Sequence, residues 1–187
     1  MKSLPLFVKV IALLVLVGAA VFLAFEVPNN DELRALILQF GYPGILIASI
    51  ISGFNVIVPI PVIAFAPALV ASGLNFWAVI VTMSVGLTLG DLFGYLIGNV
   101  GRDLTHGKEQ NFKLVRALEN LKEHHHFAPY FVMFLYAAFV PLPNEVLVIP
   151  LAFLGYKLKY LFPAFFLGNL IFNLLFGYAG VTVFSFF

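Results

Sequence analysis

Pro141-Leu142-Pro143-Asn144-Glu145 lies in the middle of an apolar segment, residues 127–155, that is long enough to cross a bilayer. About 82 residues earlier, Pro59-Ile60-Pro61 lies in a second such segment, residues 45–73. Each proline lacks a backbone donor, and its ring clashes with the preceding helical turn. Lipid cannot hydrogen-bond the carbonyl groups that this frees, so each break must be buried in protein or line a wet cavity. We therefore predict two half-helices around a broken tip in each segment.

The two segments belong to an internal repeat with a spacing of about 82 residues. The aligned pairs are Gly73 with Gly155, Gly86 with Gly168, Asp91 with Asn173 and, after one inserted residue, Gly94-Tyr95 with Gly177-Tyr178. Paired, proline-broken hydrophobic segments in the two halves of a membrane protein are typical of a transport pathway at the interface between the repeats.

The composition is that of an integral membrane protein. Hydrophobic residues make up 62% of the 187 positions and charged residues only 10%, which leaves too little polar surface to cover a soluble globule. A net charge of +1 gives no reason to expect nucleic acid as a partner, because such binding needs a clustered basic face. The chain has no cysteine, which excludes disulfides, thiolate metal sites and cysteine nucleophiles.

Residues 4–25 are apolar except for Lys9 and are long enough to cross a hydrocarbon core of about 30 Å, so we predict a transmembrane helix. A cleaved signal peptide is the alternative, because Lys2 and Lys9 resemble its charged region and Gly18-Ala19-Ala20 supplies small residues. Residues 26–40 are expected to form an exposed connector with a short helix at its end.

The long hydrophilic stretch, residues 99–126, should be cytoplasmic by the positive-inside rule, because it contains Arg102, Lys108, Lys113, Arg116 and Lys122. Its residues 110–122 have apolar side chains at near-helical spacing, which indicates an amphipathic helix either at the membrane surface or packed on the protein. His124-His125-His126 is interpreted as part of a solvated loop, because consecutive residues do not present three imidazoles tetrahedrally to a metal.

Lys157 and Lys159 follow the second broken segment, and the positive-inside rule places them in the cytoplasm as well. The second broken segment should therefore enter and leave the membrane by the cytoplasmic face, as a re-entrant hairpin. With Lys2 and Lys9 inside, the first broken segment must be a hairpin on the opposite face. Each half is then one hairpin and one full span, in inverted orientation.

Glu145 is the residue that we expect to matter most, because a carboxylate at a break inside apolar sequence is costly unless it has a function. It is interpreted as a proton-titrating or headgroup-contacting acid facing a cavity, or as a carboxylate that anchors a loop near the aqueous face. Asn144 is suited to hydrogen-bond a substrate or the backbone of its own loop. The first hairpin has Val62 and Ile63 at the matching positions, so the repeat is not chemically symmetric.

Asn55 is the strongly polar side chain near the first tip. We expect it either to cap the broken backbone or to contact a substrate. Asp91 lies inside the span at residues 76–98, N-terminal to Arg102. We favour a structural role for it over proton transfer, because its repeat partner Asn173 is uncharged. Small residues recur on one face of the same span, which permits close helix packing, at Gly86, Gly90, Gly94 and Gly98.

These residues also resemble a known family. The stretch of residues 55–61, then Gly73, and above all residues 90–98 (Gly-Asp-Leu-Phe-Gly-Tyr-Leu-Ile-Gly) are similar to the DedA, or VTT-domain (SNARE-associated Golgi protein), superfamily. Residues 141–145 with Gly155 resemble its second loop. The resemblance implies an all-α membrane protein with two opposed re-entrant hairpins that moves phospholipids or polyprenyl-phosphate carriers between leaflets, in some members linked to proton motive force.

On this resemblance residues 1–40 are an N-terminal transmembrane helix and connector, and residues 41–187 are a DedA/VTT-like domain. That domain would comprise a first hairpin (43–73), a span (76–98), a cytoplasmic loop (99–126), a second hairpin (127–156) and a span (160–183). Bacterial DedA proteins usually have an acidic group in the first hairpin and an arginine in the second. Here the first is neutral and the second has Asn144-Glu145, so this chain departs from the family in its hairpin chemistry.

We therefore expect a lipid flippase or scramblase of the plasma membrane, with its N-terminus in the cytoplasm. The two hairpin tips would form a groove for the headgroup, where half-helix N-termini attract an anion and protonation of Glu145 switches the groove. Membrane lipids are the expected partners, homo-oligomerisation is left open, and no enzymatic activity, cofactor, metal or nucleic acid is expected. The alternatives are a membrane scaffold that organises lipids or proteins and a channel for ions or small solutes.

Overall fold

A computed structural model describes residues 6–54, 61–105, 118 and 127–186. The described residues form helices and turns and contain no strand, so the predicted all-α class is confirmed. In chain order the elements are α1 (Leu6–Glu26), η1 (Val27–Asn29), α2 (Asp31–Gly53), η2 (Val62–Phe65), α3 (Ala66–Ala71), α4 (Phe76–Thr105), α6 (Ala128–Phe139), α7 (Glu145–Phe153) and α8 (Leu158–Phe184). Asn55, Pro59, the helix expected at 110–122 apart from residue 118, and the histidines at 124–126 lie outside the described residues.

Four helices in the described part of the chain are long and apolar enough to cross a membrane: Val10–Asn29, Asp31–Gly53, Phe76–Leu104 and Leu158–Phe184. The chain is therefore an integral membrane protein. The sequence predicted three of these spans, and the fourth arises because the connector helix continues directly into the first apolar segment. Asn30 caps the start of this fourth helix, since its side-chain oxygen accepts a hydrogen bond from the Leu33 backbone N–H at 3.0 Å.

Helix α2 is interrupted at Gly41, where the backbone is non-helical (φ 48°, ψ −146°). Only glycine adopts these angles without strain. Pro43 then lies in the first turn after the break, where its missing N–H would have had no helical partner. The continuous helix that follows, residues 42–53, is therefore much shorter than α2 as a whole.

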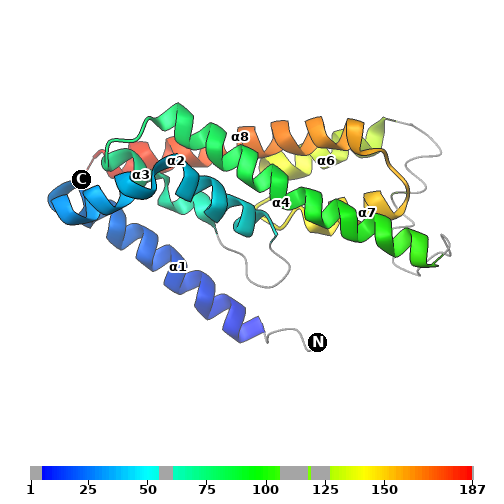
Figure 1. Ribbon diagram of the computed structural model, residues 1–187, viewed down its shortest axis with the longest axis horizontal. Helices are drawn as coiled ribbons and strands as arrows, with labels where there is room; N and C mark the ends of the chain where they lie inside the picture. Colours follow the sequence, from blue (N-terminus) through cyan, green and yellow to red (C-terminus); the bar gives the residue numbers. More distant parts are fainter. Residues whose placement is uncertain (1–5, 55–60, 106–117, 119–126, 187) are drawn as a thin grey trace.

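Helix α4 is the centre of the fold and packs against α2, α7 and α8 (Figure 1). It extends to Thr105, seven residues into the stretch that was predicted to be a loop from residue 99. Residues 99–105 contain no proline, and Arg102 in the last turn interacts favourably with the negative end of the helix dipole. Helix α8 runs antiparallel to α4, because Asn173 bonds to Ser84 while Asn169 bonds to Thr88.

Glycines allow the backbones of α4 and its neighbours to approach closely. A Cβ atom on Gly90 would lie 2.5 Å from backbone atoms of Gly53 in α2. Further along the same face, Gly98 meets the backbone of Ile149 in α7. Small residues that recur every fourth position thus place α2 and α7 against one face of α4.

Two turns of the same kind precede α4 and α8. Gly73 (φ 109°) lies just before Phe76, and Gly155 (φ 81°) lies just before Leu158. Both positive φ values are strained for residues with a side chain. These glycines are aligned in the sequence repeat, so the two halves use the same turn to start their long helices.

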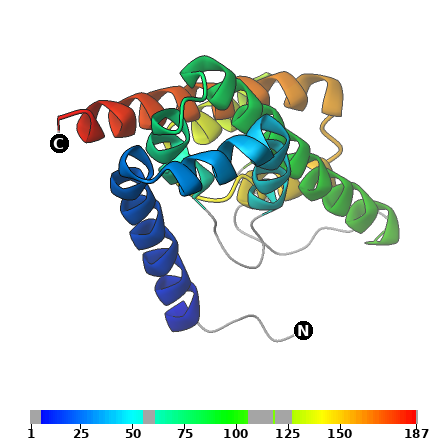
Figure 2. The same cartoon turned by 60° about the vertical axis from the view of Figure 1, so that its left-hand side comes forward.

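Helix α1 projects away from the other helices, as Figures 1 and 2 both show. Only its C-terminal end is buried, in an apolar cluster where Ala24 and Val27 pack against Ala68 of α3. Along the rest of α1 large apolar side chains such as Leu14 and Phe22 are exposed. In a membrane such a surface contacts lipid chains.

Candidate functional site

A cavity of about 310 Å³ lies where the second Pro-x-Pro turn meets Pro61 and the residues that follow it. Helices α2, α4, α6 and α8 contribute the rest of its described lining. The described lining residues are Ser52, Gly53, Pro61, Val62, Ile63, Leu87, Asp91, Ala137, Val140, Pro141, Leu142, Pro143, Asn144, Glu145, Asn169, Phe172 and Asn173. Both broken segments thus contribute to one cavity.

The second turn presents Asn144 to the cavity. Helix α6 ends at Phe139, and the Tyr136 hydroxyl donates a hydrogen bond to the Pro143 carbonyl at 3.3 Å, which fixes the turn against α6. Asn144 occupies the N-cap position of α7, yet its side chain does not cap that helix. Its side-chain amide group instead donates to the Asp91 carboxylate at 3.0 Å and to the side-chain oxygen of Asn169 at 2.9 Å.

Asp91 is the acceptor on which these bonds converge. Its Oδ2 atom also accepts a hydrogen bond from the Asn169 side-chain amide at 2.8 Å, and the same amide donates to the Thr88 hydroxyl at 3.2 Å. Asp91 is 2% exposed and Asn169 is 5% exposed. We call Thr88, Asp91, Asn144 and Asn169 the polar cluster; it joins α4, α8 and the second turn inside an apolar body.

The polar face of α4 and α8 continues one turn beyond the cluster. Asn173 donates to the Ser84 hydroxyl at 3.0 Å, and Ser84 donates to the Ile80 carbonyl at 2.7 Å. Asn173 is fully buried, and its side-chain oxygen has no hydrogen-bond partner within the part of the chain that the structure describes. Buried polar atoms are nearly always hydrogen-bonded, so this oxygen is an exception.

Glu145 lies in the first turn of α7 and is 5% exposed. It faces Gly94, since a Cβ atom on that glycine would lie 3.1 Å from the Glu145 Cγ atom. The absence of a side chain at residue 94 therefore makes room for the acid. Glu145 and Asp91 line the same cavity, and the described lining residues include no Lys, Arg or His.

Of the residues that the sequence singled out, Asn144, Glu145 and Asp91 come together with Pro61, Pro141 and Pro143 at this cavity. Val62 and Ile63, aligned with Asn144 and Glu145, line the cavity with apolar side chains. Asn55 and Pro59 lie outside the described residues. The outer glycines of the α4 face, Gly86 and Gly98, are sites of helix packing.

The sequence reasoning missed Ser84, Thr88 and Asn169, and it considered Asn173 only as a repeat partner. A signal was present. Ser84, Thr88 and Asp91 are spaced to lie on one face of a helix, and Asn169 and Asn173 are one turn apart. Two polar faces in two long apolar helices are costly in lipid unless they face each other or a cavity.

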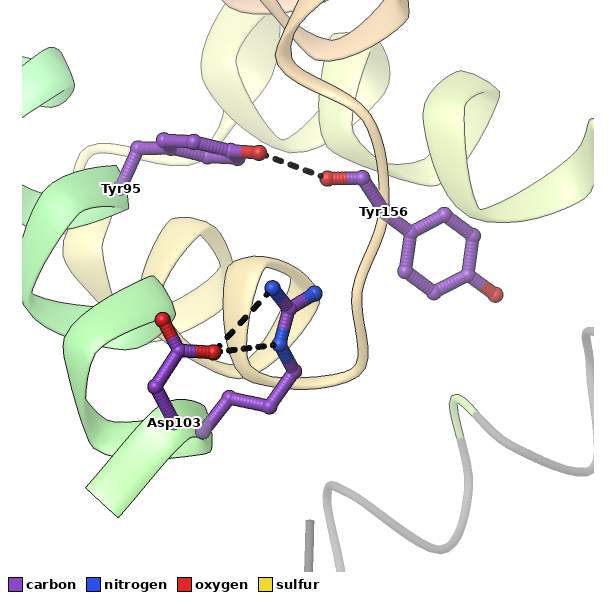
Figure 3. A network of polar contacts seen from close by, with 4 residues as sticks. Tyr95, Asp103 and Tyr156 are labelled. Carbon is purple, nitrogen blue, oxygen red and sulfur yellow. Dashed lines mark hydrogen bonds and ion pairs between the residues drawn. The ribbon is translucent and has the colours of Figure 1, made fainter. Parts of the chain in front are cut away.

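A second set of polar contacts lies in the C-terminal half of α4 (Figure 3). Tyr95 donates a hydrogen bond from its hydroxyl to the Tyr156 carbonyl at 3.1 Å, which ties α4 to the turn after α7. Arg102 contacts Asp103 at 3.4 Å on an exposed part of the helix. Asp91 is thus bonded to the asparagines of the polar cluster, and Arg102 forms an ion pair with Asp103.

An apolar groove of about 500 Å³ lies between α1 and the first half of the protein. Its described lining comes from α1, α2, η2 and α3 and is made of aliphatic side chains, two phenylalanines and two glycines. Val62 is common to the described linings of the polar cavity and the apolar groove.

The groups in the cavity are suited to reversible binding. Carboxyl, carboxamide and hydroxyl groups there can exchange hydrogen bonds with a ligand at little geometric cost. Within the described ranges no three His, Cys, Asp or Glu side chains converge as metal ligands would.

Comparison with known proteins agrees with the resemblance of the motifs. The family model described as the VTT domain matches residues 58–182, about two thirds of the chain. The match includes the glycine turns at Gly73 and Gly155, all of α4 and nearly all of α8. Neither the comparison with curated proteins nor the comparison with solved structures gave a match. The chain therefore belongs to the VTT-domain family, the family of DedA and SNARE-associated Golgi proteins.

Proposed function

We propose that this protein moves a lipid between the leaflets of its membrane, with the headgroup passing through the cavity and the acyl or prenyl chains remaining in the bilayer. A phospholipid or a polyprenyl-phosphate carrier is the substrate class. The observation on which the proposal rests is the polar cluster, of which Asp91, Asn144 and Asn169 line a cavity at both proline-broken segments inside an otherwise apolar helical body. Intramembrane polar groups of this kind are usually functional.

The helix lengths support re-entrant hairpins. Helix α6 has 12 residues and α7 has nine. At a rise of 1.5 Å per residue, 12 residues span about 18 Å, well short of a hydrocarbon core of about 30 Å. The part of α2 after Gly41 is as short as α6, so in each half two short helices would enter the membrane and return to the same face.

The positions of the two glycine turns support an inverted arrangement. The turn at Gly73 directly precedes the N-terminal end of α4. The turn at Gly155 lies at the other end of α4, because a Cβ atom on Gly155 would lie 2.9 Å from the Arg102 guanidinium. If α4 crosses the bilayer, the two hairpins open to opposite faces, as inverted repeats do.

The apolar groove next to Val62 supports a lipid as the substrate. A lipid whose headgroup occupies the polar cavity needs an apolar path for its chains close by. The groove between α1 and η2 offers such a path, and only Val62 is common to both. A membrane scaffold that merely organises lipids needs no such pair of cavities.

We further propose that Glu145 gains and loses a proton during transport. Glutamine keeps the shape of this side chain but cannot titrate, so Glu145→Gln should slow lipid transfer and remove its response to a pH gradient. The measurement is translocation of a fluorescent lipid in liposomes with and without a pH gradient. Asp91→Asn, measured in parallel, identifies which of the two acids is responsible. Undiminished, still pH-dependent transport by Glu145→Gln would overturn this role.

A channel for ions or small solutes also needs a wet cavity. It would give conductance in planar bilayers without lipid transfer in liposomes, and that combination of results would favour it over the lipid transporter.

A further inference from the structure

Arg34 is an exposed arginine near the start of α2 that has hydrogen-bond donors to spare. Its Nε atom donates to the Ser72 carbonyl at 2.9 Å, and a Cβ atom on Gly73 would lie 3.7 Å from its Nη2 atom. An arginine has five N–H donors. Within the described ranges the Nη groups of Arg34 make no hydrogen bond and no ion pair. Most of the guanidinium is therefore open to a ligand.

The apolar groove between α1 and the first half of the protein begins one helical turn from Arg34. Ile37, one turn later in α2, lines this groove, and so does Leu69, one turn before Ser72. The lining residues of α2 all follow Arg34 in the chain, and the groove continues where α1 and α2 diverge from η1 (Figure 2). A positive charge therefore lies at one end of an apolar groove.

Aromatic side chains indicate that this end of the protein lies at a membrane interface. Trp77, in the first turn of α4, is 63% exposed, and Tyr178 of α8 is 65% exposed. The ring of Phe76 lies between them, with ring centroids 5.4 Å from Trp77 and 6.5 Å from Tyr178. Exposed Trp and Tyr are enriched at the level of the lipid headgroups. Trp77 follows the turn at Gly73, which Arg34 contacts, so Arg34 lies at the same level.

We propose that a phospholipid binds here, with its phosphate on the Nη groups of Arg34 and one acyl chain in the apolar groove. The headgroup then lies at the interface and the chain extends into the membrane, as in the surrounding leaflet. Arg34 does not line the polar cavity, whereas Val62 lines both the cavity and the groove. The site therefore holds a lipid beside the cavity before its headgroup enters, a role that rests on the proposed lipid transport; binding itself does not.

A lipid phosphate fits this position better than other occupants. A guanidinium binds a phosphate through two parallel N–H···O bonds, which are charge-assisted and strong. Asp31, one turn before Arg34, makes no ion pair with it in the part of the chain that the structure describes, so direct contact does not neutralise the guanidinium. An apolar helix from a second copy of the chain would fill the groove but leave Arg34 without a counter-charge.

Two variants separate the phosphate from the acyl chain. In Arg34→Gln the side-chain nitrogen is as many bonds from Cα as Nε is, so the bond to Ser72 can be kept while the charge and the Nη donors are lost. Ala48→Phe places a ring at an exposed position of the groove lining. The matched controls are Lys157→Gln, which removes an exposed charge outside the groove, and Ala35→Phe, at an exposed residue of α2 that does not line it.

The measurement is lipid binding to the purified, delipidated protein in detergent, followed by native mass spectrometry. One titration uses palmitoyl-oleoyl phosphatidylglycerol, and the other uses palmitoyl-oleoyl glycerol, which has the same chains without the phosphate. The inference predicts one tightly bound phosphatidylglycerol per chain, with a Kd about tenfold or more below that of the diacylglycerol. Arg34→Gln should bring the two Kd values together, Ala48→Phe should weaken the binding of both lipids, and the controls should match the unaltered protein.

A preference for phosphatidylglycerol that survives Arg34→Gln overturns the inference, even if the Tm falls, because Arg34 then only holds the turn at Ser72. Unchanged binding to Ala48→Phe also overturns it, as does a mass spectrum of lipid-free dimers. Lipid translocation in liposomes without this preference overturns only the inference. The preference without translocation overturns only the proposed function.

Discussion

Asn169 is the residue on which the polar cluster depends. Its side chain donates to Asp91 and Thr88 and accepts from Asn144, so one amide joins α8 to α4 and to the second turn. Thr88, Asp91 and Asn169 are buried, so water does not readily replace a hydrogen bond that is lost there. Removal of one partner therefore costs the desolvation of the others, about 1–3 kcal/mol for each neutral group.

Asn169→Leu should for this reason lower the stability of the protein by about 2–4 kcal/mol, since it leaves both Asp91 and Asn144 with fewer partners. The measurement is thermal unfolding in detergent, followed by circular dichroism. Asn29→Leu is the control, because Asn29 is exposed and bonds only to the Phe25 carbonyl, four residues earlier. Equal Tm values for the two variants would contradict the importance given to Asn169.

At the scale of elements, the fold depends on glycines that let helices touch. Gly90 and Gly53 meet backbone to backbone where α4 crosses α2. A methyl group at residue 90 has no flexible neighbour to displace, so the two helices must separate. Gly18 in α1 is the opposite case, because a Cβ atom there would have nothing within 4 Å.

Gly90→Ala is therefore expected to destabilise the protein by about 1–3 kcal/mol, as overpacking usually does. Gly18→Ala should leave the stability unchanged or raise it by a few tenths of a kcal/mol, because alanine favours the helix. Both variants are compared by their Tm in the same detergent. A Gly90→Ala protein as stable as Gly18→Ala would show that α2 and α4 are not in close contact.

Much at this scale was predictable from the sequence. The proline breaks, the start of α4 at Phe76 and the glycine turns follow from local backbone chemistry, which acts within a few residues. The partners of Asp91 were not predictable, because they depend on the register between α4 and α8 and on where the second turn meets both. That register is set by packing of residues about 80 positions apart, and composition does not encode it.

At the scale of the whole molecule, the proposed inverted arrangement has a direct consequence for topology. Asn75 follows the turn at Gly73, and Lys157 follows the turn at Gly155. Both are exposed, and the chain has no native cysteine. Asn75→Cys should react with a membrane-impermeant thiol reagent in intact cells, whereas Lys157→Cys should react only after the cytoplasmic face is opened. Labelling of both from one face would contradict the inverted arrangement.

The central claim, that a lipid headgroup passes through the cavity between the two turns, is tested most directly by blocking that cavity in an otherwise unaltered protein. Leu142 lines the cavity and is 59% exposed, and it takes no part in the polar cluster. Leu142→Cys protein in liposomes is assayed for fluorescent-lipid translocation before labelling, after labelling with a bulky methanethiosulfonate reagent, and after reduction. Asp103→Cys serves as the labelled control. The account predicts that labelling of Leu142→Cys stops translocation, that reduction restores it, and that the control is unaffected; full labelling with unchanged translocation would contradict it.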